Sequence, residues 1–291
     1  MVDQFMLDKR RVRRSFDRAA ATYDRVAVLQ REICDRMVER LQYIKFEPRV
    51  ILDAGCGTGY GSGQLRKRYA KSRVIELDIA LAMLRASRDR QQGWKRLLPF
   101  MAVPAQICGD LESLPLRDGS VGMVWSNLAL QWCNDLGAAF SGMHDVLESG
   151  GLLMFSTFGP DTLKELRQVF GALDAGAHVN RFVDMHDVGD ALMQAGFAEP
   201  VMDMETVTLT YDDLAGLMCD LKALGAHNAN QGRGKGLLGK GAWQRLQQNY
   251  EALRRNGKLP ATYEVVYGHA WKGEKKQQPL ADGAQVVRFH K

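Results

Sequence analysis

The 291-residue sequence predicts an α/β domain in which helices cover both faces of a mostly parallel sheet. Three observations favour this class. Short apolar segments alternate with helical patterns five times between residues 49 and 173. A glycine-rich turn follows the first apolar segment, and acidic residues lie at the ends of the first three. Parallel strands need helical crossovers, so this alternation is typical of a doubly covered parallel sheet.

Each element follows from a local pattern. Residues 8–46 repeat apolar side chains near the helical period and predict N-terminal helices, which Pro48 ends. Five apolar segments are the predicted parallel strands: 49–55, 72–78, 105–110, 121–127 and 151–158. Helices are predicted after Gly59 and at 79–90, 134–148 and 162–173, the last with Asp161 as candidate cap. Residues 91–104 contain one glycine and two prolines and predict a loop.

The last third of the chain has a different pattern. A helix predicted at 185–197 precedes two alternating segments, 201–211 and 261–271, which we interpret as antiparallel edge strands. The predicted organisation has four units: an N-terminal helical cap (1–48), a core (49–211 with 261–272), an inserted helical lid (212–260) and a polar tail (273–291). Within the tail, residues 284–289 could add a short strand.

Composition limits the class of protein. The chain is 46% apolar and 25% charged with a net charge of +5, which is ordinary for a globular protein. No segment reaches the ~18–20 apolar residues of a membrane helix, and the N-terminus has no signal-peptide core. Five scattered cysteines without a CxxC pair argue against disulfides or a metal site. We expect a cytoplasmic protein that uses neither a membrane nor a metal.

The glycine loop is the sharpest feature of the sequence. After the first strand come Asp53, Gly55, Gly57 and Gly59, with Cys56 read as a packing residue. Glycines there let a ligand rest on the main chain. A dinucleotide would place its pyrophosphate at this turn, and Asp53 would repel it. The same carboxylate attracts an ammonium group, so we favour S-adenosylmethionine (SAM) over a nicotinamide dinucleotide.

The other strand ends supply the remaining cofactor candidates. Asp78 lies about twenty residues beyond the last glycine and is the candidate ribose acceptor, with Ile79 beside it and Glu76 as a possible second acid. A helix cap is the alternative reading of Asp78. Asp110 and Leu111 are candidates for the adenine end, although Asp110 could equally be a turn residue. Asn127 ends the fourth strand at the switch point and is expected near the methionine moiety.

Together these residues resemble the class I SAM-dependent methyltransferases over about residues 49–158. A narrower resemblance, to the malonyl-acyl carrier protein O-methyltransferases of biotin synthesis, is carried by six further segments: 20–31, 126–132, 155–166, 178–187, 221–228 and 260–271. It implies a Rossmann-like sheet of seven strands, mostly parallel with one antiparallel edge strand, preceded by N-terminal helices and interrupted by a helical lid. It also implies methylation of the free carboxylate of malonyl-acyl carrier protein. Residues 91–104 are longer than the family pattern implies.

The expected chemistry needs positioning more than proton transfer. A malonyl carboxylate is ionised at neutral pH, since carboxyl pKa values lie near ~4, so no general base is expected. Tyr23 and Trp132 are candidate walls of the reacting centre, and His178 and Arg181 lead the candidates for orienting the anion. The other candidate cations are His186, Lys222, His227 and Arg233. Core packing or a surface position is the alternative for each of these side chains.

Two basic segments suggest a partner. Arginines crowd residues 9–14, and a second basic segment covers residues 222–258. An acidic acyl carrier protein would dock on such a surface. Three other functions stay open: methylation of another small carboxylate, a SAM-binding scaffold without catalysis, and nucleic-acid methylation. The last is disfavoured because Ser126-Asn127-Leu128-Ala129 replaces the Asn/Asp-Pro-Pro-aromatic motif that base-flipping amino-methyltransferases carry.

Overall fold

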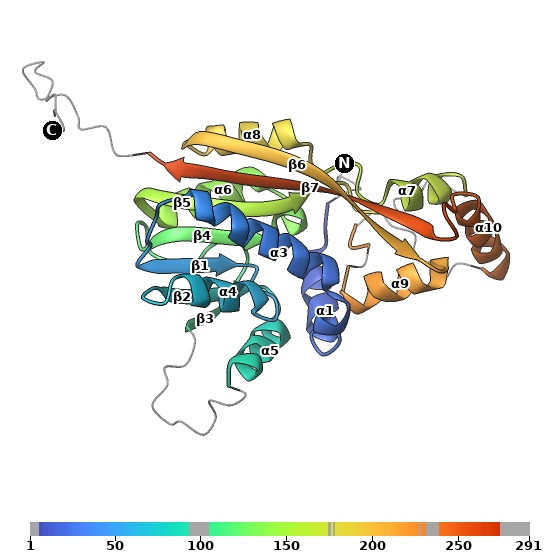
Figure 1. Ribbon diagram of the computed structural model, residues 1–291, viewed down its shortest axis with the longest axis horizontal. Coiled ribbons are helices and arrows are strands. Elements are labelled where there is room, and N and C mark those ends of the chain that lie inside the picture. The colour runs from blue at the N-terminus through green and yellow to red at the C-terminus, as the bar shows by residue number, and fades with distance from the viewer. Residues whose placement is uncertain are drawn as a thin grey trace, which may run out of the picture.

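Figure 1 shows the computed structural model of the chain, which describes residues 6–92, 105–173, 176, 178–226, 228–230 and 239–273. The predicted loop from residue 93 to 104 lies outside this part. So do the tail from residue 274, with its possible strand at 284–289, and the site candidates His227 and Arg233.

A seven-stranded sheet forms the centre of the molecule, as predicted. Its strands are β1 (Val50–Ala54), β2 (Arg73–Asp78), β3 (Ala105–Cys108), β4 (Val121–Asn127), β5 (Leu147–Phe158), β6 (Phe197–Tyr211) and β7 (Leu259–Lys272). The strand order is β3-β2-β1-β4-β5-β7-β6, and the first five strands run parallel. β7 runs antiparallel to both of its neighbours, and β6 forms the edge beside it. The order reverses between β1 and β4, which places a ligand-binding crevice at their carboxyl ends.

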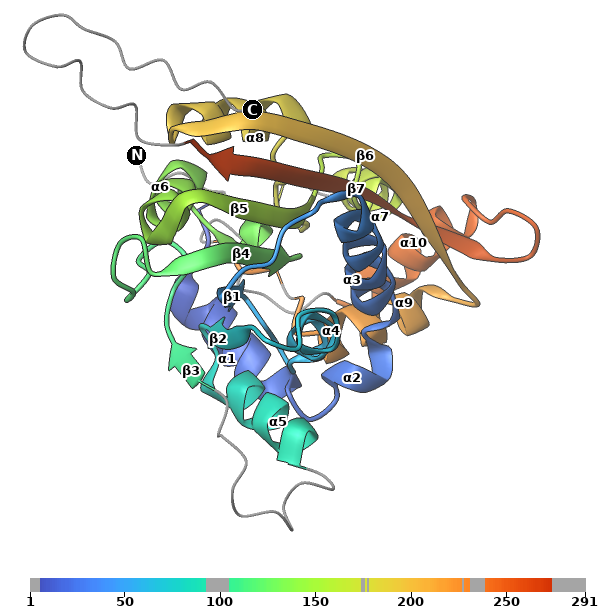
Figure 2. The ribbon, with the colours of Figure 1, turned by 60° about the vertical axis from the view of Figure 1, so that its left-hand side comes forward.

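Helices cover both faces of this sheet (Figure 2). Their bounds are α1 (Lys9–Ala19), α2 (Tyr23–Val26), α3 (Val28–Arg40), α4 (Tyr60–Arg68), α5 (Leu81–Gln92), α6 (Leu136–Val146), α7 (Lys164–Gly171), α8 (Met185–Gln194), α9 (Leu214–Ala223) and α10 (Lys240–Glu251). α3 and α4 bury apolar side chains on one face, and α6 and α8 do so on the other. No helix in the described ranges has the length and apolar character needed to cross a bilayer.

The N-terminal segment forms three helices rather than a continuous one. α1 lies across the carboxyl end of the sheet and packs against α5, whereas α3 packs on the sheet face (Figure 1). The Thr22 hydroxyl between α1 and α2 donates to the Ala223 carbonyl at the end of α9, 3.1 Å away. Leu7 also forms a β-bridge with Asn230. The N-terminal helices are therefore joined to the segment between β6 and β7 above the carboxyl ends of the strands.

Several boundaries differ from the sequence prediction. The helix predicted at 185–197 ends at Gln194, and the first two residues of the loop predicted at 91–104 belong to α5. β5 begins at Leu147, so Gly150 and Gly151 lie inside the strand instead of ending the preceding helix. Gly151 is required there because a Cβ would lie 2.8 Å from the Glu148 carbonyl oxygen. Asp161 does not cap α7: Leu163 occupies the cap position with a φ of 55°, and the Asp161 carboxylate pairs with Lys164 instead.

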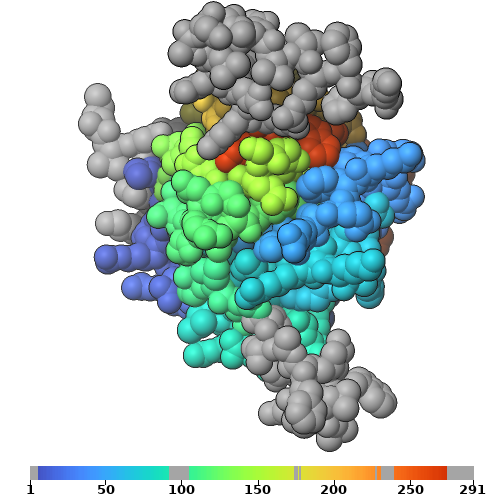
Figure 3. Space-filling model, turned by 90° about the vertical axis from the view of Figure 1, so that its left-hand side faces the viewer, coloured from blue at the N-terminus to red at the C-terminus, as the bar shows by residue number. Residues whose placement is uncertain are grey.

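Figure 3 shows the end of the molecule at which the parallel strands begin, opposite to their carboxyl ends.

Candidate active site

The carboxyl ends of β1 to β4 form one crevice, which we call the cofactor crevice. Most of the predicted cofactor residues line it, and they come from four separate segments: Gly55, Gly57, Asp78, Ile79, Asp110, Leu111 and Asn127. Tyr23 and Trp132 line the same crevice. Asp53 lies in an adjoining recess with Gln30, Trp125 and Tyr23. Sequence patterns at separate strand ends therefore identified residues that the fold brings together.

The glycine loop gives the crevice its shape. Gly55, Gly57 and Gly59 have φ values of 85°, 53° and 79°, a region that favours glycine. A Cβ at Gly57 would meet no atom within 4 Å, so open space lies against the main chain there. A Cβ at Gly59 would lie 2.0 Å from Ser87 Oγ, which makes Gly59 a packing residue at the start of α4. Gly55 and Gly57 thus shape the cradle, while Gly59 fixes the helix behind it.

Asp78 is held in place by the loop that it faces. Its carboxylate accepts hydrogen bonds from Gly57 N (2.9 Å) and Ala80 N (2.8 Å). Burial raises its pKa to about 6 despite these hydrogen bonds. A carboxylate has about four acceptor sites, so two remain for a vicinal diol such as ribose. The bond to Ala80 N closes a turn just before α5, which begins at Leu81, so Asp78 does not cap a helical amide as the alternative reading expected.

Asp53 is a buried acid without an ion-pair partner in the described part of the chain. It is 2% exposed and accepts a hydrogen bond from Ser62 Oγ at 2.5 Å. Burial raises its pKa to about 7, and the nearby Glu76 charge contributes. A ligand ammonium group beside it would restore the ionised form. Gln30 and Trp125 line the same recess, and their Oε1 and Nε1 atoms are buried and make no hydrogen bond within the described residues, which is compatible with a polar ligand there.

Glu76 has a structural role instead of the possible ribose contact. Its carboxylate is fully buried and accepts hydrogen bonds from four side chains, Arg66, Ser87, Gln91 and Gln106. Burial opposes its ionisation, but the hydrogen bonds from Gln106 and Arg66 hold its pKa below the usual value. Glu76 therefore ties α4, α5 and β3 to β2 behind the crevice.

Asp110 and Asn127 are both engaged by protein groups. Asp110 pairs with Lys9 of α1 at 2.8 Å, and Lys9 also pairs with Glu112 at 2.7 Å. The Asn127 side chain donates to the Gln30 carbonyl at 3.1 Å and accepts from Ser156 Oγ. Sequence reasoning missed Lys9 because no local pattern connects it with an acid 101 positions away.

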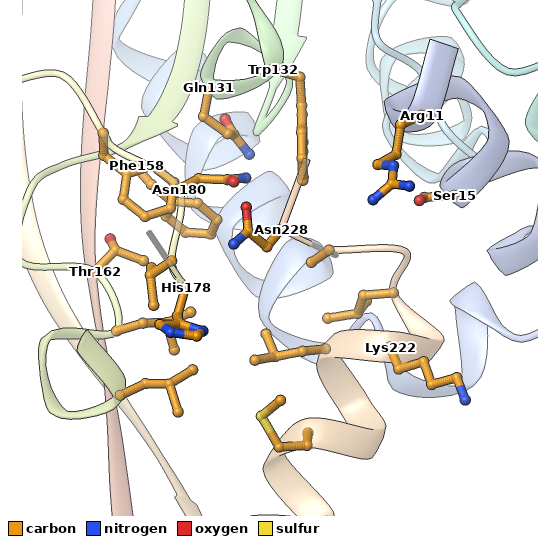
Figure 4. Close-up of a pocket in the computed structure, with 18 of the residues that line it drawn as sticks. Arg11, Ser15, Gln131, Trp132, Phe158, Thr162, His178, Asn180, Lys222 and Asn228 are labelled. Atoms are coloured by element: carbon orange, nitrogen blue, oxygen red, sulfur yellow. The ribbon is translucent and has the colours of Figure 1, made fainter. Parts of the chain in front are cut away.

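A second, larger cavity opens next to the cofactor crevice, and we call it the acceptor cavity. It has a volume of about 920 Å³ and lies between the sheet edge and α1, α7, α9 and α10. Six residues line both spaces: Gln30, Gln131, Trp132, Phe158, Leu224 and Ala226. We call this shared region the junction. Figure 4 shows Gln131 and Trp132 at one end of the acceptor cavity, with Arg11 and Lys222 on another side.

The structure places the candidate acceptor-binding residues in different parts of the site. Tyr23 lines the cofactor crevice, and Trp132 lies at the junction, where its ring meets Phe16 edge-on at 5.1 Å. His178 lines the acceptor cavity and stacks on Phe170 with ring centroids 4.2 Å apart. Arg181 is exposed and lies outside the lining of both spaces.

His186 also lies outside, at the start of α8, where it pairs with Asp184. Lys222 does line the acceptor cavity, together with Arg11, Arg14 and Arg18.

Comparisons with known proteins agree with this geometry. A methyltransferase-domain family model matches residues 52–155. A malonyl-acyl carrier protein O-methyltransferase of Laribacter hongkongensis is 59% identical over 100% of this chain and 98% of its own length. The protein of the same name from Gallionella capsiferriformans is 58% identical over 99% and 98% of the two chains. The YcgJ protein of Bacillus subtilis shares the fold, with a TM-score of 0.58 at 14% identity over 82% of this chain and 99% of that one.

Fold and site therefore define a methyltransferase with a Rossmann-like sheet and a glycine-lined cofactor crevice. Within that class, the chain belongs to the malonyl-acyl carrier protein O-methyltransferase family, because its relatives match it at high identity over almost their whole length.

Proposed function

We propose that this enzyme transfers the methyl group of SAM to the free carboxylate of malonyl-acyl carrier protein, which yields the methyl ester that starts the pimeloyl chain of biotin. One observation carries the proposal. A crevice with buried acids for a cationic nucleoside opens through an uncharged junction into a large cavity with a basic rim. The names of the relatives support the same substrate.

The residues around the junction hold the reactants in place and keep water away from them. When bound, SAM supplies an activated methyl group, whose carbon bonds to the carboxylate oxygen as the carbon–sulfur bond breaks and leaves its electron pair on sulfur. No proton moves, so no general base is required. Trp132, Phe158 and Leu224 exclude water from the junction. Holding the reacting atoms in line in such a site can supply ~7–11 kcal/mol.

The rim of the acceptor cavity supports a carrier-protein partner. Arg11, Arg14 and Arg18 are spaced by three and four residues on one face of α1, and Lys222 lies on α9. None of these four side chains forms an ion pair within the described residues. We infer that they form the docking surface, with residues 1–48 as a cap and 212–260 as a lid around the acceptor.

Other basic residues of the lid are engaged elsewhere. Arg254 pairs with Glu251, and Lys258 pairs with Asp212 at 2.5 Å, near the turn before β7. Such pairs leave less positive charge for a partner. The proposed docking surface is therefore centred on α1 and Lys222.

Charge reversal tests the docking surface. Arg14→Glu with Arg18→Glu should raise the KM for malonyl-carrier about tenfold or more at low salt and weaken its salt dependence, because steering between opposite charges is lost. Arg49→Glu with Arg73→Glu is the matched control, since both arginines are exposed at the amino ends of β1 and β2. Equal effects of the two pairs would exclude a specific docking role for α1.

Substrate comparison tests the reaction itself. Transfer of a labelled methyl group from SAM should be fastest to malonyl-carrier and slower to succinyl-carrier, glutaryl-carrier and malonyl-CoA. Faster transfer to malonyl-CoA or to a free carboxylic acid would assign the enzyme to a small acceptor. SAM binding without transfer to any thioester would instead favour a scaffold that has lost catalysis.

A further inference from the structure

Among the described residues, none at the junction between the two spaces carries a charge. Its six residues are two glutamines, two aromatic residues, a leucine and an alanine. The cations of the acceptor cavity come instead from its rim on α1 and α9. Any reacting carboxylate must lie at this junction, because the methyl donor and the acceptor meet only where the two spaces join.

Gln131 is the junction amide that the fold holds in a defined orientation. Its Nε2 donates to the Leu128 carbonyl at 2.7 Å, and its Oε1 accepts from Thr157 Oγ1 at 3.4 Å. These contacts use one of the two amide hydrogens, and no acceptor in the described part of the chain takes the other, which can donate to a ligand. Figure 4 shows the Gln131 side chain directed into the acceptor cavity.

The backbone that supports Gln131 is unusual. Leu128 has a φ of 50°, which is rare for a residue with a side chain. Its amide donates to both the carbonyl and the hydroxyl of Ser156, at 3.1 Å each, and this holds the turn after β4. The turn aims the Leu128 carbonyl at Gln131. Such conformations persist where neighbouring structure enforces them, and they concentrate at functional sites.

An uncharged donor suits this reaction better than a cation. The carboxylate loses its negative charge as the ester forms, so a guanidinium or ammonium partner would stabilise the reactant more than the transition state. An amide hydrogen bond orients the carboxylate but stabilises the reactant over the transition state less than a cation would. It also leaves the sulfonium as the main positive charge near the nucleophile.

We propose that Gln131 holds the reacting carboxylate of the acceptor through its free amide hydrogen and thereby selects substrates with a terminal carboxylate at the junction. This inference rests on the proposed carboxyl methylation. Gln30, the other junction amide, differs because it also lines the recess of Asp53 and its Oε1 is buried, so we assign it to the cofactor side.

Two variants test the role of Gln131. Gln131→Leu should lower kcat/KM for malonyl-carrier about tenfold to a hundredfold, as expected for loss of a hydrogen bond to a charged group, while the Kd for S-adenosylhomocysteine stays within about twofold. Gln131→Glu should be less active still near pH 8. Its rate relative to the wild type should rise as the pH falls and the introduced carboxylate becomes protonated. Gln194→Leu, at an exposed position on α8, is the matched control and should behave as the wild type.

Three results would overturn the inference. An unchanged kcat/KM for Gln131→Leu would show that the amide does not contact the acceptor. A loss of S-adenosylhomocysteine binding by both variants would give Gln131 a structural role only. A constant rate ratio between Gln131→Glu and the wild type over pH 6–8 would also contradict it. If the wild type itself transfers no methyl group to malonyl-carrier, the proposed function fails first and this inference fails with it.

Discussion

Lowering the pH should weaken SAM binding through Asp53. Burial raises the pKa of this carboxyl group to about 7 when the recess holds no cation. A bound ammonium group favours the ionised form, so below pH 7 binding must first remove a proton. At pH 5.5, only about 3% of a group with this pKa is ionised, against about three quarters at pH 7.5. Protonation of Asp53 alone should therefore lower the association constant for SAM roughly twentyfold to thirtyfold between these pH values.

Isothermal titration calorimetry in two buffers with different ionisation enthalpies measures both the affinity and the protons released. Near pH 6, binding should release about one proton because most of Asp53 is protonated before binding. Asp53→Asn should bind SAM more weakly and lose most of the decline between pH 7.5 and 6.5. The smaller decline near pH 6 should remain, since burial raises the pKa of Asp78 to about 6. Wild-type affinity that stays constant down to pH 5.5 would refute this account of Asp53.

A fall in pH should affect the stability of the ligand-free protein through Asp53 in the opposite direction to its effect on SAM binding. The folded protein holds a proton on Asp53 that the unfolded chain releases above pH ~4, so this group makes the ligand-free protein less stable as the pH rises from ~4 to 7. Bound SAM should offset that loss. The increase in Tm caused by SAM should therefore be larger at pH 7.5 than at pH 5.5 in a thermal unfolding series.

Four further substitutions have defined outcomes. Asp78→Ala should weaken SAM and S-adenosylhomocysteine binding at least tenfold in equilibrium dialysis, because hydrogen bonds to charged groups contribute about 1.5–3 kcal/mol each; unchanged affinity would remove Asp78 from the site. Gly59→Ala should lower the free energy of unfolding by about 1–3 kcal/mol in urea, since its Cβ would lie 2.0 Å from Ser87 Oγ at a positive φ. Gly63→Ala, which meets no atom within 4 Å inside the same helix, should instead stabilise by about 0.5–1 kcal/mol. Lys9→Met should speed S-adenosylhomocysteine release in stopped-flow measurements, because Lys9 ties α1 to the acids after β3; an unchanged rate would show that α1 does not restrain the ligand.

The sequence predicted residues that the fold brings together in the crevice, because its signals are local. A strand, a glycine turn and an acid at the next strand end lie within about thirty residues, and the register of a parallel sheet brings such ends together. Asp78 and Gly57 illustrate this, since the carboxylate of one accepts from the amide of the other. The seven strands were predicted for the same reason. The start of β5 was predicted too late, because the glycines inside this strand suggested a break in the chain.

The acceptor side was harder to predict because it depends on contacts between distant segments. Lys9 reaches Asp110 across the carboxyl edge, and Leu7 pairs with Asn230, but no periodicity records either approach. Charge counting also gave equal weight to all the basic residues of the lid. Only the fold distinguishes Lys222 at the acceptor cavity from Arg254, which is paired near β7.

The most direct test of the central claim is the mass of the acyl group on malonyl-carrier after incubation with the enzyme and SAM. Our account predicts that malonyl-carrier gains the mass of one methyl group less the proton that it replaces, that alkali releases this methyl group as methanol, and that acetyl-carrier, which lacks a free carboxylate, gains none. It would be contradicted if malonyl-carrier gained no methyl group, or if alkali released the methyl group still bound to the acyl carbon chain instead of as methanol, because the acceptor atom would then not be a carboxylate oxygen.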